Sequence, residues 1–599
     1  MEDITEIKYL EYGAKLQTYC PHCHRGLNKK YPRDKSEFVE LGIEYNKNKG
    51  KLKLSPYLNI FENEVSLDMP VGAEAEDVFC PYCKTSLMVE DHKCDLGDHK
   101  VAKILVSAFS RLLPFYICTR RGCRWHGLDP KDQGWLKIHI PRQKMPEQDP
   151  FMRVKNFDEV PLGLRADQAK LEANRCLQCP TPYCVEGCPV NIDIKGFIDK
   201  IREDDLMGAI KIIKDTNSLP AVCGRVCPQE IQCESKCILG RTEHPVAIGN
   251  LERFVADYER AMGVQIPTRP KPTGKNVAII GSGPSGLTMA AEMARAGHGV
   301  VVFEALHELG GVLVYGIPEF RLPKEIVKKE IDYLKKLGVV FKTNHVIGKL
   351  FTVEELLNEL KFDAVYIATG AGLPRFMKIP GENAPGVFSS NEYLTRMNLM
   401  KAYKFPDYDT PNPRARRMVV VGGGNVAMDC ARTGLRAPGT EKVMLVYRRA
   451  RNQMPARSEE IHHAEQEGVE FHLLTNPVKV IANRRGWVCG LECIKMELGE
   501  PDDSGRRRPI PIEGSEYVLD CDMVVIAIGT GPNEIMFQEG CEVKRNKWGY
   551  IDADAETGKT TMEGVWAGGD IVTGSATVIL AMGAARQAAK EINEYLNNK

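Results

Sequence analysis

The chain has 599 residues, with 80 Lys and Arg against 80 Asp and Glu, so its formal net charge is zero. This balance gives no electrostatic support for binding nucleic acid or an anionic membrane, and the length predicts about four domains. The 20 cysteines are too dilute for a secreted disulfide scaffold.

The cysteines and the first residues indicate where the protein works. The sequence begins MEDITEIKYL, without the basic and apolar segments of a signal peptide. The most apolar stretch, 101–117, is interrupted by Lys103, Arg111 and Pro114, so we expect no membrane insertion. We therefore expect a cytoplasmic protein whose cysteines are reduced and bind metals.

Residues 1–150 contain paired cysteines among short β-like runs, which predicts a zinc-ribbon-like metal-binding module. Two C-x2-C turns, Cys20/Cys23 and Cys80/Cys83, can together form one tetrahedral zinc site. A second zinc site would use Cys94, Cys118, Cys123 and His126.

Two alternatives stay open for this module. Cys80/Cys83 can instead join Cys118/Cys123, which leaves Cys20/Cys23 to combine with Cys94 and a histidine. A rubredoxin-like iron held by four thiolates would leave the same sequence pattern. The pattern therefore predicts one or two metal ions, with zinc as the preferred element.

Residues 151–272 are helix-like and contain two further cysteine sets. The first, Cys176-x2-Cys179-x4-Cys184-x3-Cys188-Pro, is close to the spacing of ferredoxins. The second is Cys223-x3-Cys227-Pro-x4-Cys233-x3-Cys237. Because zinc prefers two C-x2-C pairs, these eight cysteines favour two [4Fe–4S] clusters.

Residues 277–304 form the first of two glycine-rich units. An apolar strand leads into the turn Gly281-x-Gly283-x-x-Gly286, an Ala-rich helix follows, and a second strand ends at Glu304. Such a turn brings backbone close to a pyrophosphate at a helix N-terminus, and the acid can bind ribose hydroxyls. This pattern predicts a dinucleotide-binding domain.

Residues 418–449 repeat the pattern with Gly422, Gly424 and Ala427 in the turn. The second strand ends in Arg448 and Arg449 instead of an acid, and guanidinium groups can bind a 2′-phosphate. We therefore expect NADP(H) here, with Arg457 as a weaker ligand. The alternative is that these arginines are solvated surface charges.

The remaining strand ends complete a recognisable set. The runs 364–371 and 523–533 each lead into a small-residue turn, and Asp570 follows a strand near the C-terminus. GSGPSG with Glu304, ATG at 368–370, GGGNVAMD and AGGDI together resemble the two-dinucleotide-binding flavoprotein family. With the cysteine sets, residues 151–599 closely resemble the small subunit of bacterial glutamate synthase, the FAD subunits of ferredoxin-dependent NADP transhydrogenases and part of dihydropyrimidine dehydrogenase.

The resemblance implies an α/β protein with two nested Rossmann-like domains. The expected domains are a metal-binding module at 1–150, a helical double [4Fe–4S] domain at 151–272, an FAD domain at 273–390 and 530–599, and an NADP(H) domain at 391–529. Expected FAD contacts are Gly281, Gly283, Pro284, Ser285, Gly286, Glu304, Gly310, Gly311, Leu313, Ala368, Thr369, Gly370, Gly569, Asp570 and Thr577. Expected NADP contacts are Gly422, Gly424, Asn425, Val426, Ala427, Arg448, Arg449, Arg457 and Gly529.

The resemblance also implies that the two cysteine sets interlace. One cluster would be bound by Cys176, Cys179, Cys184 and Cys237, and the other by Cys188, Cys227 and Cys233. In some relatives the fourth ligand of the second cluster is not a cysteine, and Glu252 occupies that place here. Cys223 is then either a substitute ligand or a buried thiol.

Three functions are compatible with these motifs. The first is an NADP(H)-dependent FAD and iron–sulfur subunit of a larger complex, such as an electron-bifurcating ferredoxin/NAD(H)/NADP(H) transhydrogenase. The second is the NADPH-oxidising small subunit of glutamate synthase. The third is an assembly or electron-relay subunit without nicotinamide turnover. Hydride transfer between nicotinamide and flavin needs no acid–base residue, so we expect no catalytic side chain.

Overall fold

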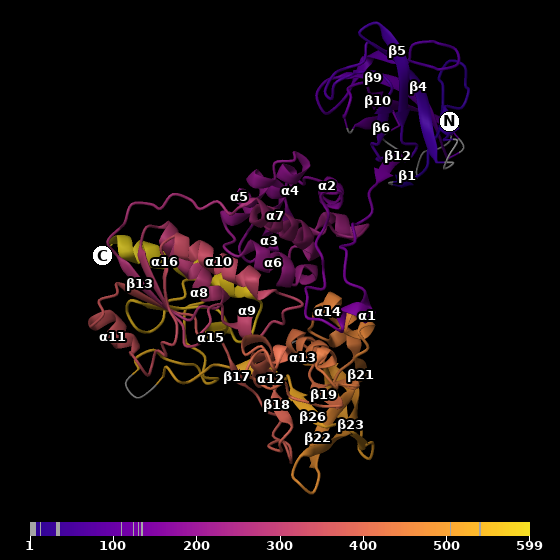
Figure 1. Cartoon of the computed structure of the whole chain (residues 1–599). Coiled ribbons are helices and arrows are strands. Elements are labelled where there is room, and N and C mark those ends of the chain that lie inside the picture. Colours follow the sequence, from indigo (N-terminus) through magenta and orange to yellow (C-terminus); the bar gives the residue numbers. More distant parts are fainter. Residues whose placement is uncertain are drawn as a thin grey trace. The chain divides into compact units, whose positions relative to one another are not determined.

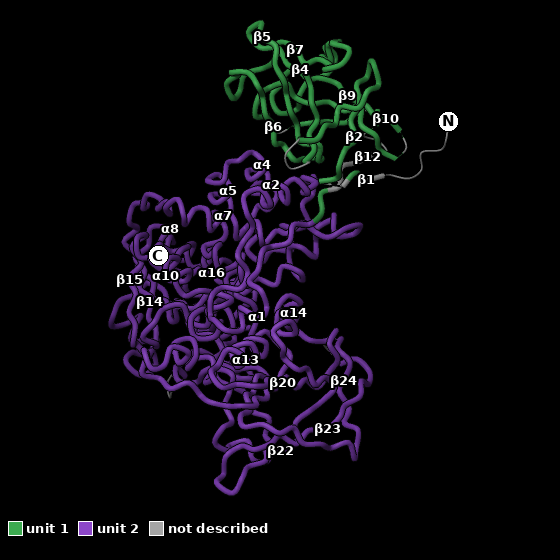
Figure 2. Tube along the Cα trace, turned by 45° about the vertical axis from the view of Figure 1, so that its right-hand side comes forward, with its two compact units in different colours: residues 1–141 green, residues 142–599 purple. Residues whose placement is uncertain are grey.

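The computed structural model describes residues 8–11, 13–31, 36–109, 111–123, 125–129, 131–132, 136–502, 505–537 and 541–598. The chain divides into two compact units, 1–141 and 142–599 (Figures 1 and 2). The boundary between these units lies at 141, whereas the predicted one lies at 150; Arg142 already forms an ion pair with Glu234 of the second unit. No described helix combines the length and apolar character that a membrane crossing requires.

The first unit repeats one β arrangement twice. Each copy has a strand, a C-x2-C turn, a second strand and a long hairpin. The first copy is β2 (Gln17–Tyr19), β3 (Asn28–Lys30), β4 (Glu37–Tyr45) and β5 (Asn48–Leu54). The second is β7 (Asp77–Phe79), β8 (Met88–Lys93), β9 (Lys100–Ala108) and β10 (Arg111–Cys118). The sequence repeats too, as Tyr-Cys-Pro-His-Cys at 19–23 and Phe-Cys-Pro-Tyr-Cys at 79–83.

The two copies exchange their first strands. β2 pairs with β9 of the second copy, and β7 pairs with β4 of the first. The second strands stay with their own hairpins, β3 on β4 and β8 on β9. With β6 (Asn63–Val65) and β11 (His126–Leu128) this gives two five-stranded sheets, and β1 (Lys8–Glu11) pairs with β12 (Leu136–His139). One apolar core, with Leu27 and Leu87 at equivalent places, lies between the copies.

The second unit begins with helices that hold the cysteine loops. They are α1 (Pro150–Arg153), α2 (Ala166–Asn174), α3 (Tyr183–Glu186), α4 (Ile194–Arg202), α5 (Leu206–Lys214), α6 (Pro220–Val226) and α7 (Ile248–Met262). Asp193 and Asp205 cap α4 and α5 by accepting bonds from the backbone N–H of Gly196 and Gly208. Both helices bury their apolar faces in one core, as the predicted helical domain requires.

A five-stranded parallel sheet follows, in the order β15-β14-β13-β16-β28. Its strands are β13 (Asn276–Ile280), β14 (Gly299–Phe303), β15 (Val340–Lys342), β16 (Ala364–Ile367) and β28 (Val565–Ala567). Its helices are α8 (Pro284–Arg295), α9 (Val312–Tyr315), α10 (Lys324–Lys336), α11 (Val353–Asn358), α15 (Asp570–Thr573) and α16 (Val578–Asn598). α8 packs on α16, which brings the first glycine turn beside the C-terminal segment.

A second parallel sheet has the order β18-β26-β19-β20-β21. It comprises β18 (Val387–Ser389), β19 (Arg417–Val421), β20 (Lys442–Tyr447), β21 (Glu470–Leu473) and β26 (Met523–Ile526), with α12 (Ser390–Leu394), α13 (Asn425–Arg436) and α14 (Ser458–Gln466). Because β18 belongs to this sheet, the predicted boundary at 390 lies too late. β17 (Leu373–Pro374) pairs with β27 (Thr530–Gly531) where the chain crosses between the two domains.

The second sheet is extended by antiparallel strands that we did not predict. β22 (Thr475–Ala482), β23 (Val488–Pro501), β24 (Arg507–Pro511) and β25 (Tyr517–Leu519) form this layer. It packs on β19 and β26 through a shared apolar cluster that includes Val480, Leu491 and Val524.

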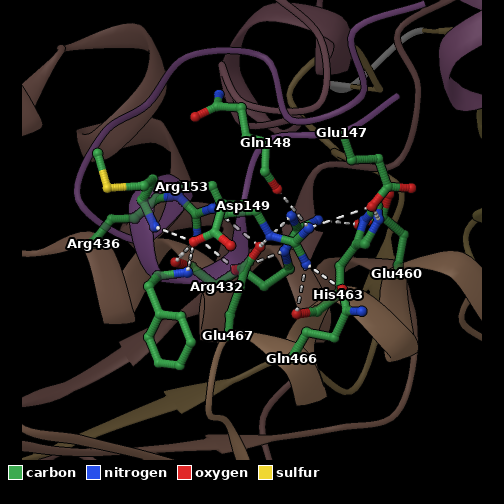
Figure 3. Close-up of polar contacts among 12 residues, drawn as sticks. Glu147, Gln148, Asp149, Arg153, Arg432, Arg436, Glu460, His463, Gln466 and Glu467 are labelled. Carbon is green, nitrogen blue, oxygen red and sulfur yellow. Dashed lines mark hydrogen bonds and ion pairs between the residues drawn. The ribbon is translucent and has the colours of Figure 1, made fainter. Parts of the chain in front are cut away.

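A buried ion network ties α1 to α13 and α14 (Figure 3). Glu467 receives hydrogen bonds from three guanidinium groups: Arg153 Nε at 2.8 Å, Arg432 NH2 at 2.7 Å and Arg436 NH1 at 2.7 Å. Burial alone would raise the pKa of Glu467, but Arg432 and Arg436 hold it at about 2. The segment before the cysteine loops is thereby fixed to the second dinucleotide domain.

Candidate functional site

The first glycine turn fits a close approach of backbone to a ligand. Gly281 has φ +103°, and a Cβ there would lie 2.5 Å from the carbonyl oxygen of Ala368. A Cβ at Gly286 would lie 2.0 Å from the oxygen of Gly281, so the helix can approach the strand only without a side chain. At Gly283 no other atom lies within 4 Å of such a Cβ, which leaves that face open. α8 begins at Pro284, with its N-terminus at this open face.

Glu304 is buried at the end of β14 and organises the turn. It accepts hydrogen bonds from the backbone N–H of Ser282 at 3.0 Å and of Leu306 at 2.9 Å, and from the Ser282 hydroxyl at 2.5 Å. The Ser282 hydroxyl in turn accepts a bond from Gly310 N–H at 2.9 Å. A Cβ at Gly311 would lie 2.9 Å from Gly283 Cα, so the Gly310–Gly311 pair fits against the turn.

The C-terminal part of the predicted FAD site lies beside this turn. Gly569 has φ +79°, and its Cβ position is 3.0 Å from Ser285 Cβ. Asp570 accepts a bond from Ala576 N–H at 3.3 Å, and burial raises its pKa to about 6. Leu313 is fully buried, whereas Gly370 has φ +69° and open space around its Cβ position.

Tyr315, at the end of α9, lies near the two acids of the predicted FAD site and was not among the predicted contacts. Burial raises its pKa to about 12, and the carboxylates of Asp570 and Glu304 add to this shift. One tyrosine therefore lies within electrostatic reach of both acids of the site. It lies one residue before Gly316, in a segment that matched none of the motifs considered, so only the fold could assign it.

The second glycine turn repeats the geometry of the first. Gly422 has φ +148°, and its Cβ position is 2.3 Å from the oxygen of Ala527. Around Gly424 the nearest atom is Pro455 Cγ at 4.0 Å, so this turn is also open on one face. Asn425 and Val426 begin α13, and Ala427 is fully buried beneath them. Gly529, after β26, has φ +108° and open space at its Cβ position.

The three arginines predicted for the NADP phosphate differ in their surroundings. Arg448 is exposed, and it forms no ion pair with any residue that the structure describes. Arg449 is buried and donates to Arg507 O at 2.9 Å and to Asp502 at 2.6 Å. Arg457 is buried and donates to Gln229 Oε1 at 2.8 Å and Arg225 O at 3.1 Å. As NADP ligands all three stay predictions, but only Arg448 is open to a ligand here.

Four cysteines line one cavity. Three of them belong to the first cysteine set of the sequence, and the fourth, Cys237, belongs to the second. Besides Cys176, Cys179, Cys184 and Cys237 it is lined by apolar side chains, among them Leu177, Ile198 and Val246. Burial raises the pKa of Cys184 to about 12, so a thiolate there needs a cation.

The other set is more deeply buried and lies near the first dinucleotide domain. Cys188, Cys227 and Cys233 are buried, and Cys188 and Glu252 both contribute to the raised pKa of Cys233 after burial itself. Burial raises the pKa of Glu252 to about 8, and Asn217 Nδ2 donates to its carboxylate at 2.6 Å. The Cys223 sulfur lies 3.5 Å from Met582 Sδ on α16.

Several contacts join these buried cysteines to α16. A Cβ at Gly583 would lie 2.7 Å from the oxygen of Pro189, the residue after Cys188. Gln232 Nε2 donates to the Thr577 hydroxyl at 3.4 Å, just before the helix begins. The buried group of Cys188, Cys227 and Cys233 therefore packs directly on the domain that carries the first glycine turn.

In the first unit, four sulfurs meet between the two copies. Those of Cys20, Cys23, Cys80 and Cys83 all lie within 4.8 Å of one another. The cross-copy distances are 3.8 Å for Cys20–Cys83 and for Cys23–Cys80. The structure thus brings together the two C-x2-C turns of the first predicted pairing, while Cys118 and Cys123 lie with Cys94.

His126 is a correction to the predicted second set. It lies opposite Ile117 in the β10–β11 pair, so its ring shares a face with Ile117. Cys118, the next residue of β10, points to the other face. The His126 ring packs between Phe61 and Phe115, each 4.8 Å away, and burial lowers its pKa to about 4. Spacing along the chain could not reveal which face each side chain takes.

Comparison with known proteins agrees with this arrangement. Residues 153–264 match the model described as dihydropyrimidine dehydrogenase domain II, 4Fe-4S cluster, and residues 262–588 match pyridine nucleotide-disulphide oxidoreductase. The chain is 38% identical to the glutamate synthase [NADPH] small chain of Halomonas elongata over 77% of this chain and 98% of the relative.

Two further relatives are subunits of other enzymes. The NADP(+)-dependent formate dehydrogenase subunit beta of Moorella thermoacetica is 41% identical over 69% of this chain and 60% of that subunit. The NADPH-Fe(3+) oxidoreductase subunit beta of Geobacter sulfurreducens is 38% identical over 74% of this chain and 68% of that subunit. All three matches leave about a quarter of this chain without a counterpart.

Proposed function

Since the chain belongs to the pyridine nucleotide-disulphide oxidoreductases and, within them, to the NADP-dependent FAD and iron–sulfur oxidoreductases that include the glutamate synthase small chain, we propose that it moves electrons between NADP(H) and a partner subunit. The observation that carries the proposal is the packing of the buried cysteine set on α16. It joins a dinucleotide domain to a row of metal-binding thiols inside one unit.

The first glycine turn fits FAD. Its open face at Gly283, the N-terminus of α8, the buried Glu304 and the half-buried Asp570 suit a pyrophosphate with a ribose and a flavin side chain. Bound FAD supplies two-electron chemistry with nicotinamide and one-electron chemistry with iron–sulfur clusters. The chain contributes binding, orientation and exclusion of water.

The second turn fits NADP(H). Gly424 leaves room for a pyrophosphate at the start of α13, and exposed Arg448 stands at the end of β20, where a 2′-phosphate would lie. Arg449 and Arg457 support this site indirectly, because they fix the neighbouring loop and the cysteine domain. The preference for NADP(H) over NAD(H) therefore rests mainly on Arg448.

The two cysteine sets fit two [4Fe–4S] clusters in series. Cys188, Cys227 and Cys233, with Glu252 or Cys223, would hold the cluster next to α16, and Cys176, Cys179, Cys184 and Cys237 the outer one. Among the described residues, no three of these thiols have all their sulfurs within 4.8 Å, which suits a polynuclear cluster better than a single ion. Leu177 and Tyr183 are exposed beside the outer set, where a partner can approach.

The four thiols between the copies of the first unit fit a structural zinc ion. A tetrahedral site with Zn–S bonds of about 2.3 Å has sulfurs about 3.8 Å apart, which matches both cross-copy distances of 3.8 Å. Zinc there would join the two copies and stabilise the unit. Iron in the same site is the alternative that metal analysis decides.

Two kinds of complex fit this electron path. An electron-bifurcating ferredoxin/NAD(H)/NADP(H) transhydrogenase is our first proposal. The first unit would serve as an additional docking module for such a complex. The match to the glutamate synthase small chain covers 98% of that relative but only 77% of this chain, so that relative has no room for such a module. The small subunit of glutamate synthase is the second, favoured by the same match. A relay subunit without nicotinamide turnover is disfavoured by the intact Gly422 and Gly424 turn.

The test is an anaerobic reductive titration. We expect purified protein to contain FAD, iron, sulfide and zinc, and NADPH to bleach the flavin band faster than NADH does. No bleaching by NADPH would refute the proposed function, and faster bleaching by NADH would refute the role of Arg448. Purification from the native source, with identification of bound subunits, distinguishes the two complexes.

A further inference from the structure

Three thiols of the first unit stand apart from the four-cysteine site. The sulfurs of Cys94, Cys118 and Cys123 all lie within 4.8 Å of one another, and all three residues are free cysteines. Cys94 Sγ and Cys123 Sγ are 3.7 Å apart. That separation is far above a disulfide bond of about 2.0 Å. It agrees with the spacing of about 3.8 Å that tetrahedral zinc imposes on two thiolates.

The chain brings these thiols together from three places in the second copy. Cys94 follows β8, Cys118 ends β10, and Cys123 lies in the loop before β11. The turn after Cys94 is closed by hydrogen bonds from Cys94 N–H to His99 O at 2.9 Å and from Asp98 N–H to Cys94 O at 2.9 Å. Metal binding here would join a turn, a strand end and a loop at one edge of the sheet.

The site has no counterpart in the first copy. No cysteine occurs between Cys23 and Cys80, although the strands and turns of the two copies match. The three cysteines are therefore not a remnant of the repeat, and the four-cysteine site already joins the copies without them. A metal ion bound by these three cysteines would therefore be independent of the zinc ion proposed for the four-cysteine site.

The surroundings favour a bound cation over three free thiols. Cys94 is 2% exposed, and Val89, Val101, Tyr116 and Trp125 pack around the group. The Trp125 indole N–H donates to Asp95 at 3.1 Å, which holds the ring over the loop. Three sulfurs in an apolar setting match the soft ligands that zinc selects.

We propose that Cys94, Cys118 and Cys123 bind a second zinc ion as thiolates, with a small exchangeable ligand such as water or a low-molecular-weight thiol in the fourth position. His126 is excluded as the fourth ligand by its place on the opposite face. Among the described side chains, no further Cys, His, Asp or Glu offers an atom within 4.8 Å of all three sulfurs. Three protein ligands and one exchangeable ligand are the arrangement of zinc sites that bind small molecules.

The first test counts metal in the full-length protein. We expect about two zinc ions per chain by mass spectrometry, falling to about one in Cys94→Ser and in Cys123→Ser, with iron and flavin unchanged. Cys489→Ser, at an exposed cysteine of the second unit, and His126→Gln should both retain about two. One zinc ion in the unaltered protein, iron in place of the second zinc, or loss of zinc in His126→Gln would overturn the proposal.

The second test does not depend on the folding of any variant. Zinc K-edge absorption of the unaltered protein, purified without added thiol, should give an average of about 3.5 sulfur ligands per zinc, since the chain supplies four sulfurs at one site and three at the other. Added 2-mercaptoethanol should raise the average toward about 4 by entering the open position. An average of about 4 before addition, or no change after it, would show that the chain itself supplies the fourth ligand.

Discussion

At the scale of single residues, the two glycine turns show what spacing can predict. Gly281, Gly286 and Gly422 are required because a Cβ at each would lie within 2.5 Å of a backbone oxygen. The need for glycine at these positions comes from the local turn geometry, so the spacing of the motif reveals it. Arg449 and Arg457 could not be assigned in the same way, because their partners lie dozens to hundreds of residues away. Only the folded chain shows that these two are held by protein groups.

Arg448 should carry most of the discrimination between NADPH and NADH. In Arg448→Ala we expect KM for NADPH to rise roughly tenfold or more, because a charged hydrogen bond to phosphate contributes about 1.5–3 kcal/mol. KM for NADH should change little. The matched control is Arg416→Ala, whose exposed side chain pairs with Glu441. Equal effects on both nucleotides would contradict the assignment.

His126 should make the first unit sensitive to mild acid. Burial lowers its pKa from 6.5 to about 4. Below pH 6.5 the histidine is therefore protonated in the unfolded chain but still neutral in the folded chain. Stability is therefore full above pH 6.5 and falls as pH decreases toward 4. Between pH 6.5 and 5.5 the free energy of unfolding should fall by ~1 kcal/mol, because the limiting slope of ~1.4 kcal/mol per pH unit is reached only once the unfolded histidine is fully protonated.

His126→Phe isolates this contribution from other acid effects. The variant should show a smaller fall in stability across the same pH range, measured by hydrogen exchange of β10 and β11 in the full chain with zinc present. A pH dependence identical to that of the unaltered protein would mean that other groups cause it.

At the scale of elements, α1 is held by one carboxylate shared among three guanidinium groups. In Glu467→Ala these buried cations lose that partner, and we expect destabilisation of ~3–5 kcal/mol. The control Glu441→Ala removes an exposed ion pair and should cost less than ~1 kcal/mol. Urea unfolding of both variants, followed by the NADPH-reducible flavin signal, measures the difference.

The elements also show where prediction failed. The βαβ units were predictable because short apolar strands, glycine turns and Ala-rich helices alternate in order. The antiparallel layer β22–β25 was not predicted, because it lies outside the βαβ pattern, although the partly alternating burial of β23 is typical of a half-buried antiparallel strand. The repeat in the first unit was visible at 19–23 and 79–83, but strand exchange depends on pairings between residues that are 33 to 37 positions apart for β4 and β7 and 86 to 90 apart for β2 and β9.

At the scale of the whole molecule, the predicted FAD, NADP(H) and iron–sulfur sites all lie in the second unit. Both glycine turns and both iron–sulfur cysteine sets lie within 142–599, which has its own cores. We therefore expect a chain of residues 142–599 to retain flavin, iron and NADPH-dependent flavin reduction within about twofold. Zinc should be absent from it. Loss of flavin reduction in a folded, iron-loaded truncation would show that the first unit takes part in electron input.

The exchange of strands in the first unit bears on its ancestry and symmetry. Each half carries two of the four clustered cysteines and places its first strand on the hairpin of the other half, so a single half with the same arrangement would be completed by a second copy in a two-fold dimer. Joining both halves in one chain fixes their ratio at one to one and allows their sequences to differ. The cysteines at 94, 118 and 123 occur in one half alone, a divergence that a symmetric dimer of identical chains could not have made.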